Sequence, residues 1–506
     1  MLLFFLSLLA NYRLLGLGWD RPLLGMHDFR QTQTAISTRS LLRGSPLLEY
    51  ETPVLGKPWA IPIEFPLYQA IVAAVVRVTG MPLDQAGRLV SVIAFYAMLP
   101  FLHSLLAHVQ RDRALRLVPL SLLLASPLYI FWSRAFLIES LALLLSISFL
   151  WLAARAVTKR RADLAGAAAL LGVLAALTKV TTFVVASVPL AAWLVAGIVR
   201  AARQRRPGDG LAAGVFGAVL VIPSLLATAV WVRYSDSVKR LNPLAADFLT
   251  HEALREWIYG TFEERFSPAV WYAMLHRSIP EIAGELRLID SVSFLVAAGC
   301  VPFVMRTRYR QASAICLLAF LSGPFVFTHL YRVHNYYFYA SGVYLLIFGS
   351  FGLFSLLESG NAKVRDATCF LVLPLLLFSM FRSHLDFFGP LQVEPPLWKL
   401  PVAAKLRSVT RPDDVIVIYG QDWNPAVPYY ADRRALMDRW EMPLGDPRFR
   451  AAMRALRGER IGAVVVSGTT RLRRDFVRER LEFFGCGAQP VYSDRFTDIY
   501  VPRGGS

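Results

Sequence analysis

The chain has 506 residues, of which 55% are hydrophobic and 18% charged, and its formal net charge at pH 7 is +18. Ordinary soluble domains carry more charge and shorter apolar runs, so this composition excludes a soluble protein. Two uncharged stretches, residues 180–199 and 211–232, are each long enough to cross a hydrocarbon core of about 30 Å as a helix. The sequence therefore predicts a polytopic α-helical membrane protein.

The positive charge lies mainly in short loops between apolar segments. This pattern is typical of the cytoplasmic side of a membrane protein, and it argues against nucleic acid as a partner. From segment 88–109 onward, the basic loops occupy every second gap, at residues 111–116, 155–161, 200–206, 306–310 and 363–365. We expect all five loops to be cytoplasmic.

The membrane segments predict about eleven spanning helices. The first runs from Met1 to about Gly18 and is interpreted as a span, not a signal peptide, because no basic residue precedes it and no cleavage site follows; residues upstream of Met1 remain an open alternative. The later segments are 88–109, 117–133, 135–154, 163–178, 180–199, 211–232, 291–305, 312–329, 336–357 and 367–381. Segment 65–80 is short and contains Arg77, and the basic loops stay on one side only if this segment lies at the outer interface.

This topology places residues 19–87, 233–290 and everything after about 382 outside the membrane. Most ionisable residues of the membrane region fall on that face, whereas transporters more often place such groups near the bilayer midplane. The four cysteines have no metal-binding spacing and indicate no disulfide framework.

The composition changes near residue 386, which predicts a division into a membrane domain (1–385) and a small extracytoplasmic α/β domain (386–506). We expect buried parallel strands at 413–420 and 461–468, a final strand at 495–503, and amphipathic helices at 446–457 and 471–484. The sequence DVIVIYGQDWN resembles a strand that runs into a ligand loop, but it lacks a glycine-rich phosphate motif. A structural or acceptor-binding role is therefore favoured over a catalytic one.

Basic residues at the outer ends of helices suit a lipid-linked phosphate, whose tail stays in the bilayer. Lys179, Arg332 and His334 are placed to hold such a phosphate and to stabilise it as a leaving group. Asp28 then suits a general base that takes a proton from an acceptor hydroxyl. The simpler alternatives are that Lys179 and Arg332 are interfacial cations and that Glu139 is an ion-pair partner of Arg134.

Six motifs, in this order, resemble the GT-C superfamily of polyprenyl-phosphate-sugar glycosyltransferases, which includes aminoarabinose transferases and protein O-mannosyltransferases. They are HDFRQTQTA (27–35), LGKPWAIPIEFPLYQ (55–69), GRLVSV (87–92), WSRAFLIES (132–140), LTKVTTF (177–183) and HNYYFYA (334–340). The resemblance covers about residues 1–385.

The resemblance implies an enzyme in the inner (plasma) membrane that transfers a sugar, with inversion, from a polyprenyl-phosphate donor to a hydroxyl of a lipid, glycan or protein at the outer face. It assigns catalytic roles to Asp28 and Glu139, although Phe29 stands where many members carry Glu. It places Lys179, His334 and Tyr337 near the lipid phosphate. Two further residues are candidates: Glu64 as a second acid or metal ligand, and Arg30 as a group that orients Asp28 or binds phosphate.

The sequence indicates no cofactor with certainty, and a divalent metal ion is left open. The sequence does not name the sugar, the acceptor or the oligomeric state. Two other hypotheses stand beside the enzyme: a transporter or flippase of lipid-linked sugars, and a non-catalytic assembly scaffold.

Overall fold

The computed structural model describes residues 1–285 and 305–503, which form two compact units. Each unit is assembled from separate stretches of chain. The helical unit contains Met1–Trp19, Arg88–Trp231 and Arg255–Val393. The mixed unit, which contains the sheet, comprises Asp20–Gly87, Val232–Leu254 and Glu394–Ser506. The predicted span at 291–305 lies outside the described residues, apart from its last residue.

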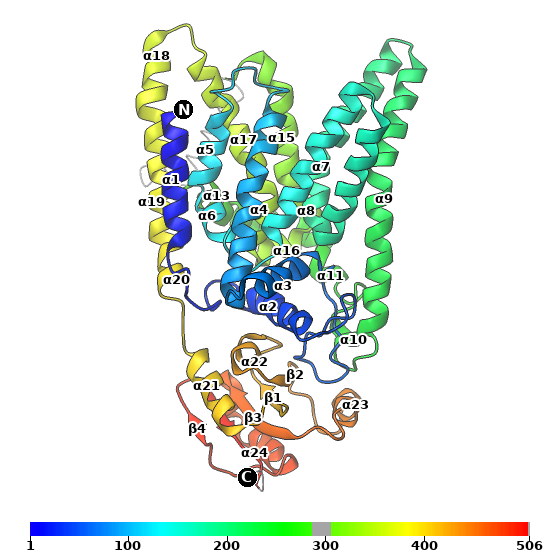
Figure 1. Cartoon of the computed structure of the whole chain (residues 1–506), viewed down its shortest axis with the longest axis vertical. Helices are drawn as coiled ribbons and strands as arrows, with labels where there is room; N and C mark the ends of the chain where they lie inside the picture. The colour runs from blue at the N-terminus through cyan, green and yellow to red at the C-terminus, as the bar shows by residue number, and fades with distance from the viewer. Residues whose placement is uncertain (286–304, 504–506) are drawn as a thin grey trace. The chain divides into compact units, whose positions relative to one another are not determined.

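Six helices in the described part of the chain are long and apolar enough to cross a membrane. The corresponding elements are α4 (Leu83–Leu106), α7 (Glu139–Lys159), α8 (Ala162–Arg203), α9 (Pro207–Lys239), α17 (Phe338–Leu357) and the run from α18 (Ala362–Ala367) to α19 (Leu373–Phe387) (Figure 1). These helices confirm a helical membrane fold. The shorter α1 (Leu2–Gly16) and α3 (Leu67–Thr79) are not among the six, so the count of eleven and the interfacial position of segment 65–80 stay predictions.

One predicted span contains a break, and two predicted spans form one helix with a break between them. Segment 117–133 is divided into α5 (Leu117–Ala125) and α6 (Pro127–Trp132), because Ser126 is extended and Pro127 has no N–H to continue the helix. In α8, Lys179 has φ −162° and ψ 99°, so a single extended residue interrupts the helix. The interruption falls at the residue that separates the predicted segments 163–178 and 180–199.

Helices α7, α8 and α9 pack through small residues. Ala153, Ala168 and Ala175 are fully buried in one apolar cluster with Phe149. At Gly172 an added Cβ would lie 2.7 Å from the Ser224 hydroxyl, so only glycine permits this approach. Close backbone packing of this kind is common where helices associate inside a membrane.

The remaining helices of the helical unit are shorter or less apolar. They are α11 (Arg255–Tyr259), α12 (Phe262–Phe266), α13 (Pro268–Ala283), α15 (Thr307–Val326), α16 (Thr328–Val333) and α20 (Gly389–Val393), with a 3₁₀ turn at Asn335–Tyr337.

The mixed unit contains a five-stranded sheet in the order β2-β1-β3-β5-β4. Its strands are β1 (Val415–Tyr419), β2 (Arg434–Asp438), β3 (Ile461–Ser467), β4 (Tyr492–Ser493) and β5 (Thr497–Tyr500). β1 is parallel to β2 and β3, and β5 is antiparallel to β3. Strand β1 is completely buried, as expected for an uninterrupted apolar run in a parallel sheet. The predicted C-terminal sheet is confirmed.

Four helices accompany the sheet: α21 (Lys399–Val409), α22 (Ala426–Ala431), α23 (Pro447–Ala455) and α24 (Arg474–Phe483). Helices α23 and α24 were predicted from their amphipathic patterns. Strand β2, with the sequence RALMD, was not predicted, because it lacks the β-branched residues that mark β1 and β3.

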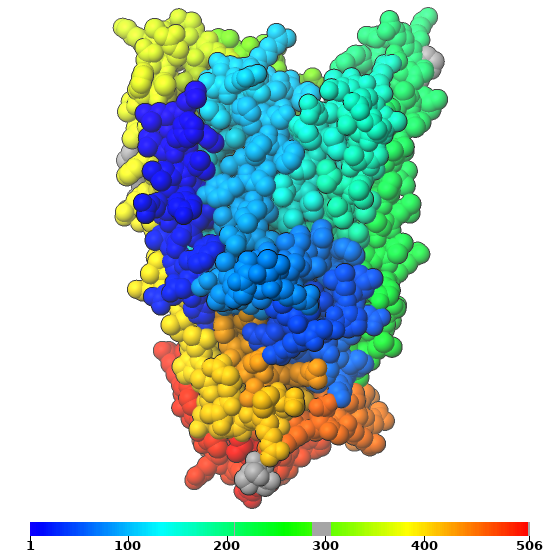
Figure 2. All heavy atoms as spheres, viewed as in Figure 1, coloured from blue at the N-terminus to red at the C-terminus, as the bar shows by residue number. Residues whose placement is uncertain are grey.

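An early segment of the chain extends the sheet at its β2 edge. The Ala435 amide donates to the Pro53 carbonyl at 2.9 Å, and the Met437 amide donates to the Val54 carbonyl at 2.9 Å. Helices α2 (Asp28–Leu42) and α10 (Ala245–Phe248) belong to the same compact unit. Figure 2 shows the blue residues of this unit against its C-terminal residues in yellow and orange. The compact unit thus includes two stretches from before residue 386. The predicted domain boundary at 385/386 stays a prediction.

Candidate active site residues

Asp28 begins helix α2 in the mixed unit, and three groups contact its carboxylate. Oδ1 accepts from the Phe29 amide at 2.8 Å and from the Asn424 amide group at 3.4 Å, while Oδ2 is paired with the Lys399 ammonium. The Lys399 and Asp28 side chains are only 10% and 21% exposed. Lys399 is the first residue of α21, and Asn424 lies in the loop after β1. Neither was predicted as a partner of Asp28, although that loop was recognised as a candidate ligand loop.

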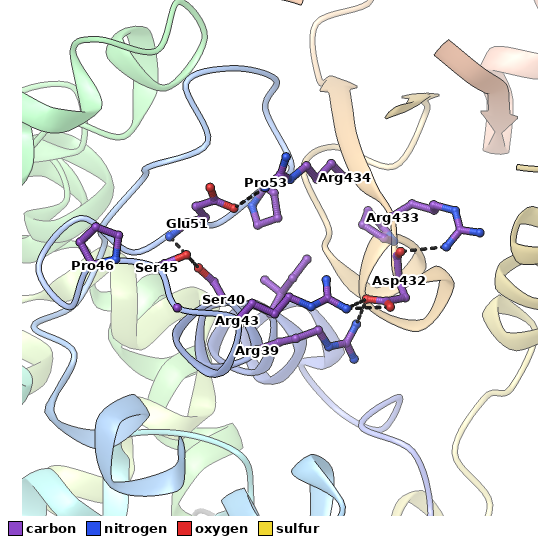
Figure 3. A pocket seen from close by; sticks show the side chains of 13 residues that line it. Arg39, Ser40, Arg43, Ser45, Pro46, Glu51, Pro53, Asp432, Arg433 and Arg434 are labelled. Atoms are coloured by element: carbon purple, nitrogen blue, oxygen red, sulfur yellow. Dashed lines mark hydrogen bonds and ion pairs between the residues drawn. The ribbon is translucent and has the colours of Figure 1, made fainter. Parts of the chain in front are cut away.

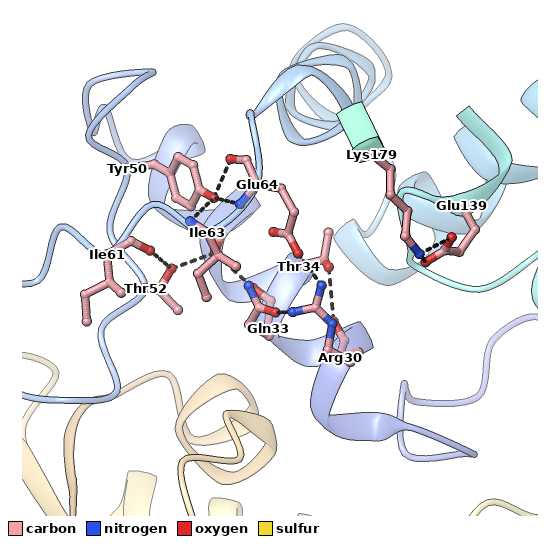
Figure 4. Close-up of polar contacts among 11 residues, drawn as sticks. Arg30, Gln33, Thr34, Tyr50, Thr52, Ile61, Ile63, Glu64, Glu139 and Lys179 are labelled. Atoms are coloured by element: carbon pink, nitrogen blue, oxygen red, sulfur yellow. Dashed lines mark hydrogen bonds and ion pairs between the residues drawn. The ribbon is translucent and has the colours of Figure 1, made fainter. Parts of the chain in front are cut away.

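Arg30 lies one helical turn from Gln33 and reaches across to Glu64. Its guanidinium donates to the Gln33 side chain and forms an ion pair with Glu64 Oε1 (Figure 4). The Tyr50 hydroxyl fixes the Glu64 backbone, accepting from its amide at 3.0 Å and donating to its carbonyl at 2.8 Å. Glu64 Oε2 is buried and has no hydrogen-bond partner among the described residues. The structure thus joins the two residues that the sequence proposed separately.

Lys179 and Glu139 form a buried ion pair in the helical unit. The Lys179 ammonium lies 2.5 and 2.6 Å from the two Glu139 oxygens, and the side chains are 9% and 3% exposed (Figure 4). The ammonium also lies 4.0 Å from the centre of the Tyr337 ring. Arg134 donates instead to the Leu17 and Gly18 carbonyls. Glu139 is therefore the ion-pair partner of Lys179 instead of Arg134.

Arg332 belongs to a second charged cluster of the helical unit, centred on Glu264. Glu264 Oε1 accepts from Arg332 at 2.7 Å and lies 3.1 Å from His329 Nδ1. Burial raises the pKa of Glu264, but the hydrogen bond from Arg332 and the charge of His329 outweigh it, so the net pKa is lowered. The Trp257 ring lies 4.7 Å from His329. Glu264, His329 and Trp257 were not predicted as site residues, because nothing in their local sequence shows that they meet.

His334 and Tyr337 lie on an aromatic strip with Tyr336. The His334 ring centre is 5.2 Å from Tyr336 and 6.2 Å from Tyr337. The strip also carries the Lys179 ammonium, 5.3 Å from the Tyr336 ring centre. The predicted group of Lys179, His334 and Tyr337 is thus assembled by one short segment of chain and the break in α8.

A metal ion would need a group of acidic, histidine or cysteine side chains. Within residues 1–285 and 305–503, no group of three or more His, Cys, Asp or Glu side chains is placed to hold a metal ion. Glu64 is held by Arg30, a cation that competes with any metal role.

A cavity of about 330 Å³ in the mixed unit is rich in arginine (Figure 3). Asp432 pairs with Arg39 at 3.0 Å and with Arg43 at 2.7 Å, and Arg434 pairs with Glu51 at 3.2 Å. The two Asp432 pairs join the end of α2 to the residues just before β2, and the Arg434–Glu51 pair joins the start of β2 to the loop after α2. None of the predicted site residues lines this cavity. We therefore assign its ion pairs a structural role, which is to hold α2 and β2 together.

No protein-family model matches the sequence, and a comparison with curated proteins gives no significant match. Solved structures, in contrast, match nearly the whole chain. ArnT from Cupriavidus metallidurans, bound to undecaprenyl phosphate, has a TM-score of 0.62 and 16% identity, over 99% of this chain and 98% of that one. The fold is that of the GT-C glycosyltransferases.

Two other GT-C structures agree. The archaeal oligosaccharyltransferase AglB from Archaeoglobus fulgidus, solved with an inhibitory peptide and a dolichol-phosphate, has a TM-score of 0.58 and 10% identity, over 99% of this chain and 74% of that one. The arabinofuranosyltransferase AftD from Mycobacteria has a TM-score of 0.56 and 16% identity, over 99% of this chain and 40% of that one. The resemblance inferred from the six motifs is confirmed as a GT-C fold, and identities this low establish the fold alone.

Proposed function

We propose that the chain is an inverting glycosyltransferase that uses a polyprenyl-phosphate-linked sugar. The observation that carries the proposal is the buried Lys179–Glu139 pair beside Tyr337, in a chain whose fold matches ArnT bound to undecaprenyl phosphate over its full length. A buried ion pair is expensive to form and is a weak source of stability. A lysine held in this way beside an aromatic strip is better explained by a ligand than by the fold.

The donor phosphate is assigned to the basic and aromatic residues of the helical unit. Lys179, His334 and Tyr337 can each donate a hydrogen bond to a phosphate oxygen, and Arg332 adds a second cation. Such charge-assisted bonds strengthen as negative charge develops on the leaving group. Glu139 then acts as a positioning residue, because both of its oxygens hold the Lys179 ammonium.

The acceptor is activated by Asp28. The carboxylate takes the proton of an acceptor hydroxyl, whose oxygen attacks the anomeric carbon of the donor sugar from the face opposite the phosphate. The bond between that carbon and the phosphate oxygen breaks, and the lipid phosphate leaves with the electron pair. One displacement inverts the anomeric centre through an oxocarbenium-like transition state. Lys399 and Asn424 hold the Asp28 carboxylate in one orientation.

The setting follows from the charge pattern and the chemistry of the donor. Five basic loops on one side of the predicted topology place the transfer on the opposite, extracytoplasmic face of the plasma membrane. The partners are then a polyprenyl-phosphate sugar, membrane lipid and a lipid, glycan or protein that offers a hydroxyl.

The test supplies membranes containing the protein with a panel of radiolabelled polyprenyl-phosphate sugars. Wild type should form a labelled product, and Asp28→Asn should lower the rate at least about 100-fold, because the amide cannot accept the proton. The control is Asp413→Asn, an exposed aspartate of the same unit, which should keep the wild-type rate. Full activity of Asp28→Asn would remove the base assignment. Flipping of the labelled lipid in proteoliposomes by both proteins, with no product, would favour the transporter.

A further inference from the structure

The loop that follows β1 occupies the position at which open α/β sheets bind ligands. β1 lies between β2 and β3, so the chain leaves β1 to one side and later returns to the other. Ligands bind outside the carboxyl ends of strands at such a switch point. The loop is tightly anchored there: Gln421 Nε2 donates to Ser467 Oγ at 2.7 Å, and an added Cβ at Gly420 would lie 2.1 Å from the Ser467 carbonyl oxygen.

The tip of this loop meets the start of α2. The Trp423 ring lies 4.6 Å from the Phe29 ring, nearly perpendicular to it, and 5.8 Å from Phe248. The next residue, Asn424, donates to Asp28 Oδ1. An aromatic ring and an amide from the switch point are thereby placed beside the candidate base.

Trp423 differs from the aromatic residues that build the core of the same unit. Tyr419 and Tyr429 are 0% and 2% exposed, whereas Trp423 is only half-buried. Asp422 beside it is exposed, and its Oδ1 is paired with Arg439 at 2.9 Å. No cationic side chain covers Trp423 within the described chain. In contrast, Arg439 and Arg448 lie 5.3 and 5.0 Å from the Trp440 ring centre. Packing alone does not require a tryptophan at the solvent-exposed end of the cluster formed by Trp423, Phe29 and Phe248.

The combination suits a sugar ring. Sugar C–H bonds carry partial positive charge and are attracted to the negative face of an aromatic ring. Sugar hydroxyls both donate and accept. They match the second N–H of the Asn424 amide group, whose other N–H donates to Asp28, and the second oxygen of Asp422, whose Oδ1 is paired with Arg439. Ligand sites generally combine aromatic surface with a few placed polar groups in this way.

We propose that residues 421–424 form the acceptor subsite and that they bind a sugar ring of a glycan acceptor. This inference rests on the proposed transferase function and specifies its acceptor. Trp423 supports the ring, and Asn424 and Asp422 bind its hydroxyls. The reacting hydroxyl is thereby presented to Asp28.

The first arm of the test measures transfer to the membrane acceptor and, separately, binding of undecaprenyl phosphate to the full-length protein by native mass spectrometry. Trp423→Ala should lower transfer about tenfold or more, while Trp423→Phe should stay within a few fold of wild type. Both variants should bind undecaprenyl phosphate as wild type does. Phe483→Ala removes an exposed aromatic ring of the same unit that packs on Phe449 and Phe484, and it should leave transfer unchanged.

The second arm records saturation-transfer NMR of the full-length protein with methyl glycosides of glucose, galactose, mannose and glucosamine. Saturation of the ring protons by wild type and by Trp423→Phe, with its loss in Trp423→Ala, supports the subsite. Equal signals in wild type and Trp423→Ala, or no signal from any glycoside, overturn it. So does wild-type transfer by Trp423→Ala, or label found on protein and not on a glycan. If wild type neither transfers the sugar nor binds undecaprenyl phosphate, the proposed function is overturned instead. The glycoside NMR result then still decides whether residues 421–424 bind a sugar.

Discussion

At the scale of single residues, Asp28 is held by side chains from distant parts of the sequence. Lys399 is 371 positions away and Asn424 is 396 positions away. A base must be oriented as well as basic, because small displacements of a reacting group reduce the rate strongly. The ammonium holds one carboxylate oxygen and the amide group holds the other, and together they provide that orientation.

Replacing Lys399 by Met should therefore lower kcat about 10-fold or more, with little change in donor KM, because the base loses its orientation but the donor site is intact. Lys399→Arg, which keeps the charge, should recover part of the rate. Lys405→Met, on the same helix, is the matched control for loss of a lysine. Steady-state rates with varied donor measure the effect, and an unchanged kcat in Lys399→Met would show that Lys399 does not position Asp28.

Glu281 is a buried acid on α13, outside the six candidate spans. Burial raises its pKa to about 7, against the hydrogen bond from Asn335 and the charge of Arg277. An unfolded glutamate has a pKa near 4.3. The native carboxyl therefore binds more protons than the unfolded one between these values, and stability falls as the pH rises from about 4 to about 7.

Glu281→Gln should remove this pH dependence, because glutamine stays neutral and still accepts from Asn335. Its thermal unfolding temperature should equal that of wild type near pH 4 and exceed it at pH 8, where the penalty removed is about 3 kcal/mol. Exposed Glu285→Gln is the control. A difference that is the same at both pH values would contradict the assignment.

At the scale of elements, α2 is a polar helix in a buried position. Its hydroxyl side chains donate hydrogen bonds to backbone carbonyls one turn earlier. The Thr34 hydroxyl donates to the Arg30 carbonyl at 3.0 Å, and the Thr38 hydroxyl donates to the Thr34 carbonyl at 2.7 Å. The helix is fastened at its far end by Asp432, which accepts from Arg39 and Arg43. Helix α2 therefore depends on ion pairs and hydrogen bonds more than on an apolar stripe.

Asp432 gives this fastening a pH dependence. Burial raises its pKa, but the hydrogen bond from Arg43 and the charges of both arginines outweigh it and lower the pKa below the ordinary value. The stabilisation is therefore fully present above the unfolded pKa of about 3.9 and is lost as the pH falls through the native pKa.

Asp432→Asn should speed amide hydrogen exchange in α2 at pH 7, and the difference from wild type should shrink as the pH falls below about 3.9 towards the lowered native pKa. Asp475→Asn, which breaks an exposed pair with Arg478, should have no such effect, because exposed pairs contribute little. Unchanged exchange in Asp432→Asn at pH 7 would show that α2 is held by other contacts.

At the scale of the whole molecule, local patterns predicted the elements but not their partners. Apolar length is a local property, so α7, α9 and α17 could be found directly, and a lysine inside an apolar run marked the break in α8. The break at Pro127 was missed, since it lies in a continuous apolar stretch. In the same way, β1 and β3 have recognisable composition and β2 does not.

For the candidate site, the sequence predicted several functional residues but few of the residues that contact them. Asp28, Glu64 and Lys179 are polar residues in unusual places, and this made them visible. Their partners are ordinary residues of helices or loops, such as Lys399, and only the tertiary fold makes them partners. A single sequence contains no measure of that proximity.

The pairing of Pro53 and Val54 with β2 also orders events during synthesis. Residues 53 and 54 are synthesised about 380 residues before β2, as the hydrogen bond between Ala435 and Pro53 shows. Forming this contact therefore closes a very long loop. Chains fold from the N-terminus as they emerge, yet Asp28 can meet Lys399 only after residue 399 has been made. A nascent chain consequently carries its long apolar helices before it carries an oriented base.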